Sequence, residues 1–291
     1  MKLTNALVLL MQEIEIEKST QGQYLRAVAR LDEYLGRPST IDDLTPPILN
    51  AWLAWLGVTH GYGPCTIRNY RAGILRVWGY CADVLEIAPP CLARRIRRPK
   101  QPQKIVRAWS LEQLELLSEA ALSLPGQLKC GIPGGLYMHT RVWVGYDTGL
   151  RPIDLRAMEW SSVDLAAETI TIVQHKTGEL HVSNIGSESV EGLKKMLSYG
   201  QPRVFPLNKY GATRWERIMY QRAEKLGFSR AKLQGIGTLR KTHATEICRV
   251  EGLSAAAASL GHKSGTAIAQ RHYVDSRLQQ GRLPPRPARR A

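Results

Sequence analysis

Apolar side chains recur every three to four positions through most of the first hundred residues, which is the pattern of helices that bury one face. The pattern predicts a helix over ALVLLMQEIEIEK, capped by Thr4, and a second helix that starts at Ser19. Thr45 and Pro46 mark the start of a third, since proline suits the first helical turn, and a fourth begins near Thr66. The apolar faces of the second, third and fourth helices are predicted to contain Tyr24, Val28, Leu31 and Leu35; Leu49, Trp52, Leu53 and Leu56; and Ile67, Tyr70, Ile74 and Trp78.

A proline-rich and basic stretch, APPCLARRIRRPKQPQKIVRAW, ends this helical pattern. Proline removes a backbone donor and disfavours helix, so a stretch of this composition predicts a boundary between domains. We therefore expect a helical domain over residues 1–96 and an exposed basic linker over residues 97–107. Linkers are also often basic only because they are solvated.

A second domain is predicted over residues 108–278, mainly helical with a small β-sheet. Ser110 and Gln113 have the spacing of a capping box at a helix start, and a later helix is expected to end at Gly149. In ETITIVQHKTGELHVSNI the apolar positions alternate, which predicts a β-hairpin with Lys176 at or beside its turn. The basic tail, residues 279–291, is too rich in proline for a regular helix.

The chain is strongly basic, with a formal net charge of +15 over 291 residues. Such an excess favours a polyanionic partner, nucleic acid first and an anionic membrane second, although a merely basic soluble protein remains an alternative. No apolar run is long enough to span a bilayer and no secretory signal is evident. Five cysteines without a CxxC pair favour a reducing compartment over a disulfide framework or a zinc site.

Five residues of the second domain could carry chemistry, but each is ambiguous when taken alone. An arginine at a helix start, such as Arg151 or Arg240 (where Thr238 could cap the helix), is usually a surface charge, and a hairpin lysine is usually solvated. His262 could simply pack in its turn. In SLGHKSGTAIAQRHYVD, Tyr273 by itself is best interpreted as a half-buried aromatic at the end of a helix.

Taken together, the motifs resemble those of the tyrosine recombinases, the phage integrase family, over nearly the whole chain. TGLRPIDL looks like the first arginine motif, HKTG like the hairpin lysine, TLRKTHAT like the second arginine motif and LGHKS like the histidine motif that precedes the tyrosine. The segment YLGRPSTIDDLTPPILNAWLAWL is similar to the family's helical core-binding domain. The resemblance implies a helical SAM-like core-binding domain followed by an α+β catalytic domain.

The resemblance also implies a reaction, in which a tyrosine attacks a DNA phosphodiester and forms a covalent 3′-phosphotyrosine that is later religated without metal, ATP or other cofactor. Arg151 and Arg240 would fork onto the phosphate oxygens, Tyr273 would be the nucleophile, and Lys176 would protonate the leaving 5′-oxygen. His262 would bind the phosphate and orient the tyrosine, and Asp154 occupies a position where the family commonly has an acidic residue. The arginines expected to contact DNA are Arg68, Arg71, Arg94, Arg95, Arg97 and Arg98.

The expected partner is double-stranded DNA, bound by a monomer that assembles into a homotetramer on paired sites, with accessory DNA-bending proteins where they are needed. Membrane is not an expected partner, and the expected location is the cytoplasm of a prokaryotic host, with the chain encoded there or on a phage or mobile element. The C-terminal tail would make only a small contact with a neighbouring protomer, or would contact DNA in place of it.

One position departs from the family pattern. Gly237 stands where the family usually has a histidine, the natural acceptor for the proton of the tyrosine. His243 is expected to point into the domain and His272 to face elsewhere on a helix, whereas a slip in the loop could bring Lys232 or Gln234 into the gap. The His262 to Tyr273 spacing is also slightly long. Gly237 keeps a catalytically silent DNA-binding relative as an alternative to a recombinase. A type IB topoisomerase, which shares much of this active site, is a second alternative.

Overall fold

The computed structural model describes residues 1–102, 105–229, 234–261 and 265–279. The chain forms two compact units, Met1–Gln103 and Lys104–Ala291, whose boundary lies within the segment predicted as a linker. Each unit is described by itself below. Within the described residues, no helix combines the length and the apolar character that crossing a bilayer requires.

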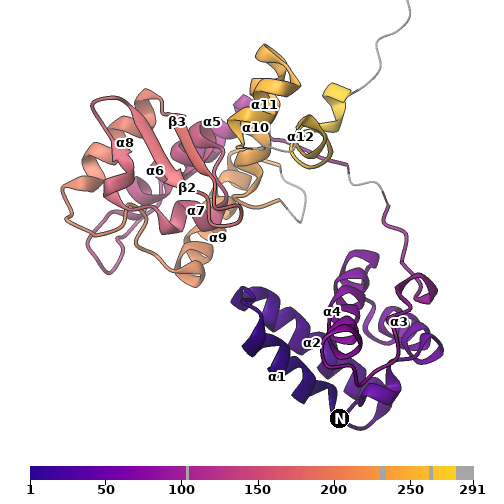
Figure 1. Ribbon diagram of the computed structural model, residues 1–291. Helices are drawn as coiled ribbons and strands as arrows, with labels where there is room; N and C mark the ends of the chain where they lie inside the picture. The colour runs from indigo at the N-terminus through magenta and orange to yellow at the C-terminus, as the bar shows by residue number, and fades with distance from the viewer. Residues whose placement is uncertain (103–104, 230–233, 262–264, 280–291) are drawn as a thin grey trace, which may run out of the picture. The chain divides into compact units, whose positions relative to one another are not determined.

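The first unit is a helical bundle around one core (Figure 1). Its elements are α1 (Leu3–Glu13), α2 (Lys18–Leu35), α3 (Pro46–His60) and α4 (Pro64–Asp83), with short 3₁₀ turns at Ile41–Asp43 and Ala93–Arg95. Most of the predicted apolar faces are buried, and they meet around Trp52 and Trp78. Both indole N–H groups donate to backbone carbonyls, Trp52 to Arg30 at 3.1 Å and Trp78 to Pro89 at 2.8 Å, so these polar atoms are satisfied in the core.

The helix starts in the first unit agree only partly with the sequence prediction. The third helix begins at Pro46 after Thr45, as predicted. Thr4 does not cap α1, because the helix already begins at Leu3 and Lys2 occupies the N-cap position. Ser19 lies inside α2, which starts one residue earlier, and α4 starts at Pro64 rather than near Thr66. In α4, proline at the first position sets the helix start ahead of the threonine.

The second unit combines helices with one small sheet, as predicted. The helices are α5 (Leu111–Leu122), α6 (Gly134–Thr148), α7 (Pro152–Ala157), α8 (Ser187–Leu197), α9 (Lys209–Lys225), α10 (Thr238–Glu251), α11 (Leu253–Ser259) and α12 (Thr266–His272), with 3₁₀ turns at Trp160–Ser162 and Ser276–Gln279. The sheet contains β1 (Val163–Asp164), β2 (Thr169–Val173) and β3 (Leu180–Asn184), antiparallel and in chain order.

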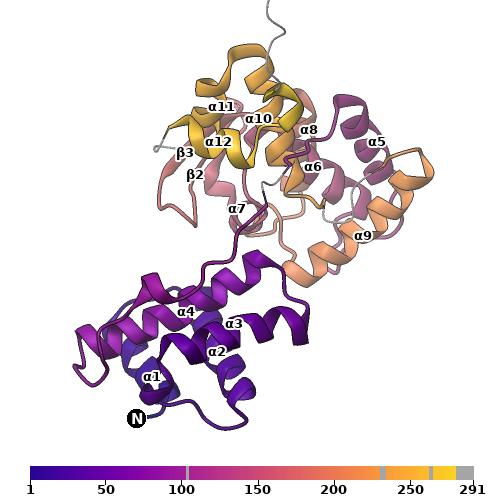
Figure 2. The same cartoon turned by 90° about the vertical axis from the view of Figure 1, so that its right-hand side faces the viewer.

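Helix α6 runs through the core of the second unit and contacts α5, α8 and α10. Helices α10, α11 and α12 follow one another at one side of the unit (Figure 2). The end of α11 lies close to the β2–β3 hairpin, since Gln174 bonds to the carbonyl of Leu260. The capping box of Ser110 and Gln113 is present at the start of α5, with both reciprocal hydrogen bonds formed. The predicted hairpin is also confirmed, with Lys176 in its turn.

Gly149 ends α6 in a left-handed conformation, φ +58°, and lies against α10. A Cβ atom at this position would lie 2.7 Å from Cδ2 of His243, so the close approach of the two helices requires glycine. The prediction that the helix ends at Gly149 is therefore confirmed. The sequence gives the reason for the turn, and the structure adds a packing reason.

Replacing Gly149 by alanine should destabilise the second unit more than a left-handed backbone alone explains. Gly200 is the matched control, since its φ is +62° and no atom lies within 4 Å of the position that a methyl group would take there. Gly200→Ala should cost about 1 kcal/mol of unfolding free energy from backbone strain, and Gly149→Ala should cost clearly more because His243 must move. Urea denaturation of both variants measures the difference, and equal losses would show that the contact with His243 carries no energy.

Candidate active site

Arg151 stands at the N-cap position of α7, directly after the Gly149–Leu150 turn that ends α6. Its Nη1 donates to Oε1 of Gln174 at 2.5 Å and lies 3.9 Å from Oδ2 of Asp154. Pro152 provides the first residue of α7 and sets the direction in which the chain leaves the turn. The guanidinium is thus held from two sides, while 16% of the side chain remains exposed.

Arg240 lies in the first turn of α10 and is almost completely buried. Its Nη1 donates to the carbonyl of Gly149 at 2.7 Å, and its Nη2 donates to the carbonyl of Leu260 at 3.0 Å. Burial, reinforced by the nearby positive charge of Arg151, lowers the pKa of Arg240 to about 10. The side chain therefore stays cationic at neutral pH, and two guanidinium groups concentrate positive charge at one place.

Tyr273 follows α12 directly, and its side chain is half-buried beside Arg240. The Cζ atom of Arg240 lies 4.8 Å from the centre of the tyrosine ring. Burial alone would raise the pKa of Tyr273, but the charges of Arg240 and Arg151 and hydrogen bonds to both outweigh it and hold the pKa below its usual value. The structure thus brings together three of the five predicted residues.

The β2–β3 turn is bonded to this centre through Gln174 and His175, where the chain leaves β2. The backbone N–H of His175 donates to Oδ1 of the buried Asp154 at 2.9 Å, and Gln174 links Arg151 to the Leu260 carbonyl through its Oε1 and its Nε2. Lys176 is exposed at the tip of the turn, and among the described residues no contact joins it to Arg151, Arg240 or Tyr273. Asp154 therefore supports the site, and Lys176 is carried next to it on a short turn.

Gln174 is a site residue that the sequence analysis missed. Its side chain is completely buried, although it directly follows the last residue of β2 and precedes an exposed turn. The alternation of β2 continues through it, since Ile170, Ile172 and Gln174 all point inward. A polar residue at an inward position is the signal that could have identified it.

His262 and Lys232 lie outside the described residues, but the position where the histidine motif begins is described. Leu260 supplies the carbonyl that both Arg240 and Gln174 bind, and Gly261 follows with φ +70°. A Cβ on Gly261 would approach Nε2 of Gln174 to 3.0 Å, so the motif starts in close contact with the site.

No side chain described around Gly237 replaces the histidine that the family pattern would place there. Gly237 occupies the N-cap of α10, where Thr238 had been expected; Thr238 is instead the first residue of the helix. His243 points into the domain, as predicted, with Nδ1 donating to the Tyr146 carbonyl at 2.8 Å. His272 is exposed, and Nε2 of Gln234 donates to the Arg107 carbonyl at 3.4 Å.

Of the arginines of the first unit predicted to contact DNA, Arg94, Arg95, Arg97 and Arg98 are solvent-exposed, whereas Arg68 and Arg71 are only partly exposed. Arg71 is engaged within the unit. Its guanidinium donates to the carbonyls of Ala93 and Ile96, the first at 2.7 Å, and its burial lowers its pKa. Asn50 binds the same stretch, donating to the Arg95 carbonyl at 3.0 Å and accepting from the Arg97 N–H at 2.6 Å. Arg71 and Asn50 therefore hold a segment whose exposed side chains are Arg94, Arg95, Arg97 and Arg98.

The sequence model of the phage integrase family matches residues 129–280, which is more than half of the chain and includes all five predicted catalytic positions. The chain belongs to the phage integrase family, the tyrosine recombinases. A search of curated proteins found no match.

Solved integrase structures share the fold of this family member at low sequence identity. A crystal structure of a lambda integrase dimer bound to a COC′ core site has a TM-score of 0.72 at 18% identity, over 97% of this chain and 79% of that one. A Tn1549 transposon integrase in complex with circular intermediate DNA has a TM-score of 0.66 at 14% identity, over 97% of this chain and 100% of that one. The mainly helical fold with a small sheet is thereby confirmed.

Clusters of three or more His, Cys, Asp or Glu side chains that could hold a metal ion do not occur among the described residues of this family member. Chemistry without metal or cofactor stays a prediction from the family resemblance. The groups that do converge are two guanidinium ions, a phenol and the amide of Gln174, which suit an anionic ligand such as a phosphate.

Low pH should destabilise the second unit through protonation of His243. Burial is the main cause that lowers its pKa to about 4, and Nε2 has no hydrogen-bond partner among the described residues, so protonation would leave a buried N–H unpaired. The unfolded chain has an ordinary imidazole pKa of about 6.5, so between these values only the unfolded state binds the proton. The stabilisation by neutral His243 is complete above the unfolded pKa and is lost as pH falls toward the folded one, by up to about 3 kcal/mol.

His243→Asn keeps a donor for the Tyr146 carbonyl and should flatten the dependence of unfolding free energy on pH across this acidic range. Urea denaturation at several pH values measures the slope. His139 and His181, whose pKa values burial also lowers, leave a residual slope in the variant. A slope equal to that of the wild type would contradict the assignment to His243.

Proposed function

We propose that this chain is a site-specific DNA recombinase or integrase that cleaves and rejoins DNA through a 3′-phosphotyrosine formed on Tyr273. The observation that carries the proposal is the position of the Tyr273 ring, 4.8 Å from the buried guanidinium of Arg240 and within the field of Arg151. A phenol beside two fixed cations is arranged to approach an anionic phosphodiester that the same cations bind.

The two arginines support different parts of the reaction. Arg151 is partly exposed and can present N–H groups to a phosphate oxygen from outside, whereas Arg240 is buried and already bonded to two carbonyls. A guanidinium fixed in this way needs no reorganisation when charge develops on the phosphate oxygens in the transition state. Lysine would be a poor replacement, because it lacks the planar fork of donors.

The proposed cleavage step conserves atoms and charge. The Tyr273 oxygen forms a bond to phosphorus and gives its proton to solvent water, while the bond from phosphorus to the 5′-oxygen breaks and that oxygen takes a proton from Lys176. His262 would bind the phosphate and orient the tyrosine. The lowered pKa of Tyr273 eases the loss of its proton, so the arginines supply part of what a histidine at position 237 would supply.

Double-stranded DNA is the proposed partner, bound largely through phosphate contacts by a chain of net charge +15. The structurally similar proteins include a lambda integrase tetramer bound to a Holliday junction, with a TM-score of 0.70. By analogy, four protomers would hold two DNA duplexes here and exchange strands in pairs. Accessory DNA-bending proteins and the expected location in a prokaryotic cytoplasm belong to the same proposal.

A nicked DNA substrate that loses a short fragment after cleavage tests the nucleophile, because religation is then blocked. Wild-type protein should accumulate a covalent protein–DNA adduct, visible as a shifted band on a denaturing gel, whereas Tyr273→Phe should form none and still bind DNA. An adduct that persists in Tyr273→Phe would overturn the assignment of Tyr273.

The same assay separates the alternatives. The first alternative, for which Gly237 is the argument, is a catalytically silent DNA-binding relative. Such a protein would bind the site tightly and give no adduct on any trapped substrate. A type IB topoisomerase would form the adduct but relax supercoiled DNA as a monomer without exchanging strands. Recombination between two target sites, together with the adduct, is the outcome that the proposal requires.

Binding of DNA by the first unit should depend on Arg98 and on Arg71 in different ways. Arg98 is exposed, so Arg98→Gln should reduce the slope of log affinity against log salt by about 0.9, the loss of one phosphate contact, and leave folding unchanged. Arg71→Gln removes donors to the Ala93 and Ile96 carbonyls and should lower thermal stability. Salt titrations of binding and thermal unfolding of both variants check this; an unchanged slope for Arg98→Gln would exclude it from the interface.

A further inference from the structure

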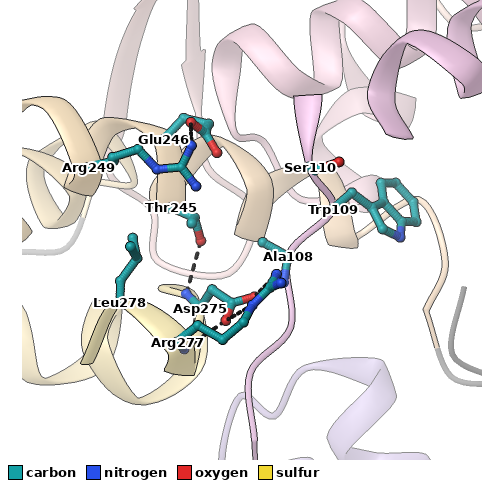
Figure 3. Close-up of a pocket in the computed structure, with 9 residues that line it drawn as sticks. All are labelled: Ala108, Trp109, Ser110, Thr245, Glu246, Arg249, Asp275, Arg277 and Leu278. Atoms are coloured by element: carbon teal, nitrogen blue, oxygen red, sulfur yellow. Dashed lines mark hydrogen bonds and ion pairs between the residues drawn. The ribbon is translucent and has the colours of Figure 1, made fainter. Parts of the chain in front are cut away.

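A buried carboxylate lies two residues after Tyr273, and the reaction proposed above gives it no role. Asp275 is 2% exposed, and both of its oxygens are occupied (Figure 3). Oδ2 accepts from the backbone N–H of Ala108 at 2.8 Å and from Nη2 of Arg277 at 3.1 Å. Oδ1 accepts from the backbone N–H of Arg277 at 2.8 Å and from its Nε at 3.1 Å, and it lies 3.6 Å from Nη1 of Arg107.

The backbone around Asp275 is also bonded to α10, the helix that carries Arg240. The N–H of Asp275 donates to Oγ1 of Thr245 at 3.0 Å, and the N–H of Trp109 donates to Oγ1 of Thr242 at 3.1 Å. Thr242 and Thr245 are three residues apart and therefore lie on one face of the helix. The segments on either side of the carboxylate are thus bonded to the same helix face.

A second pair of hydrogen bonds joins the same two segments. The N–H of Val106 donates to Oγ of Ser276 at 2.9 Å, and the N–H of Ser276 donates to the carbonyl of Val106 at 3.1 Å. Residues 106–108, at the start of the second unit, are in this way clasped to residues 275–276. We refer to these contacts of Val106, Ala108, Asp275 and Ser276 as the clasp.

The clasp is close enough to Tyr273 to control where its hydroxyl lies. Two peptide units separate Tyr273 from Asp275, a span of at most about 7 Å between Cα atoms. Val274, between them, is buried in a small core with Leu260 and Ala244, against which Tyr273 also packs. A shift of Asp275 is therefore passed on to Tyr273, while Arg240 stays bound to the Gly149 and Leu260 carbonyls.

We propose that Asp275 is a positioning residue for the nucleophile, which holds Tyr273 against Arg240 by tying the chain after the tyrosine to Ala108 and to α10. This inference rests on the proposed role of Tyr273. Asp275→Asn is the sharpest single change, because both carboxylate oxygens face N–H donors and the amide must turn its own N–H group toward one of them. The side chain keeps its size, but the negative charge that faces Arg107 and Arg277 is lost.

The experiment uses the full-length chain and the nicked DNA substrate at saturating concentration. Asp275→Asn should slow adduct formation by about 10²-fold, the scale of a misplacement of about 1 Å, with an unchanged dissociation constant for DNA. Glu216→Gln is the matched control for stability, since it disrupts the buried ion pair with Arg141 in the same unit. At a temperature where both variants are folded, the control should form adduct at the wild-type rate.

The dependence of the cleavage rate on pH provides a readout that loss of stability alone does not move. Arg240 and Arg151 hold the pKa of Tyr273 below its usual value. A tyrosine displaced from both arginines has a higher pKa, so the rise in rate with pH should shift to higher pH in Asp275→Asn and stay in place in Glu216→Gln.

Ser276 supplies a second pair of variants should Asp275→Asn fail to fold. Ser276→Ala removes the acceptor for the Val106 N–H and should slow cleavage, whereas Ser276→Thr retains a hydroxyl and should restore the rate. Cleavage by both at the wild-type rate would overturn the inference, as would a loss in Asp275→Asn that is no larger than in Glu216→Gln or that affects only DNA binding. Failure of the proposed function is distinct, because an adduct would then form with Tyr273→Phe or not form with the wild type.

Discussion

The buried guanidinium of Arg240 is the group on which the arrangement of the second unit depends. A cation that is 2% exposed is costly unless its donors are matched, and here they bind the carbonyls that follow α6 and α11. Those carbonyls belong to Gly149, where only glycine fits beside His243, and to Leu260, which Gln174 also binds. The ends of α6 and α11 and Tyr273 therefore all contact this one guanidinium, and the β2–β3 hairpin is joined to it through the shared Leu260 carbonyl.

That charge also bears on the absence of a histidine at position 237. In the proposed reaction Tyr273 has to lose a proton as it attacks, and a phenol is a weak acid at neutral pH. Arg240 and Arg151 lower its pKa despite its burial, so the acidity of the tyrosine comes from the same groups that are proposed to bind the phosphate. A Cβ at Gly237 would meet Pro152 only at ordinary contact distance, so the start of α10 does not require glycine for space.

Local signals identified the features that local interactions determine. The Ser110 capping box, the helix end at Gly149 and the hairpin around Lys176 depend on residues close in the sequence, and each was predicted correctly. Thr4 and Thr238 were wrongly expected as caps because each helix already includes them as helical residues.

Roles that depend on partners far away in the chain were not identified in this way, even where the residue itself was named, as Arg71 was. Gln174 acts through Arg151 and Leu260, Asp275 through Ala108, and Arg71 through the carbonyls of a later turn, so the contacts that define their roles cannot be read from neighbouring residues.

The clasp has a practical consequence for how the second unit can be isolated. A fragment that begins at Trp109 would contain every residue proposed to react and yet lack the two backbone groups, of Val106 and Ala108, that close the chain behind the tyrosine. A fragment of the second unit that keeps these hydrogen bonds therefore begins no later than Val106, and its boundary is decided by contacts with the far end of the unit.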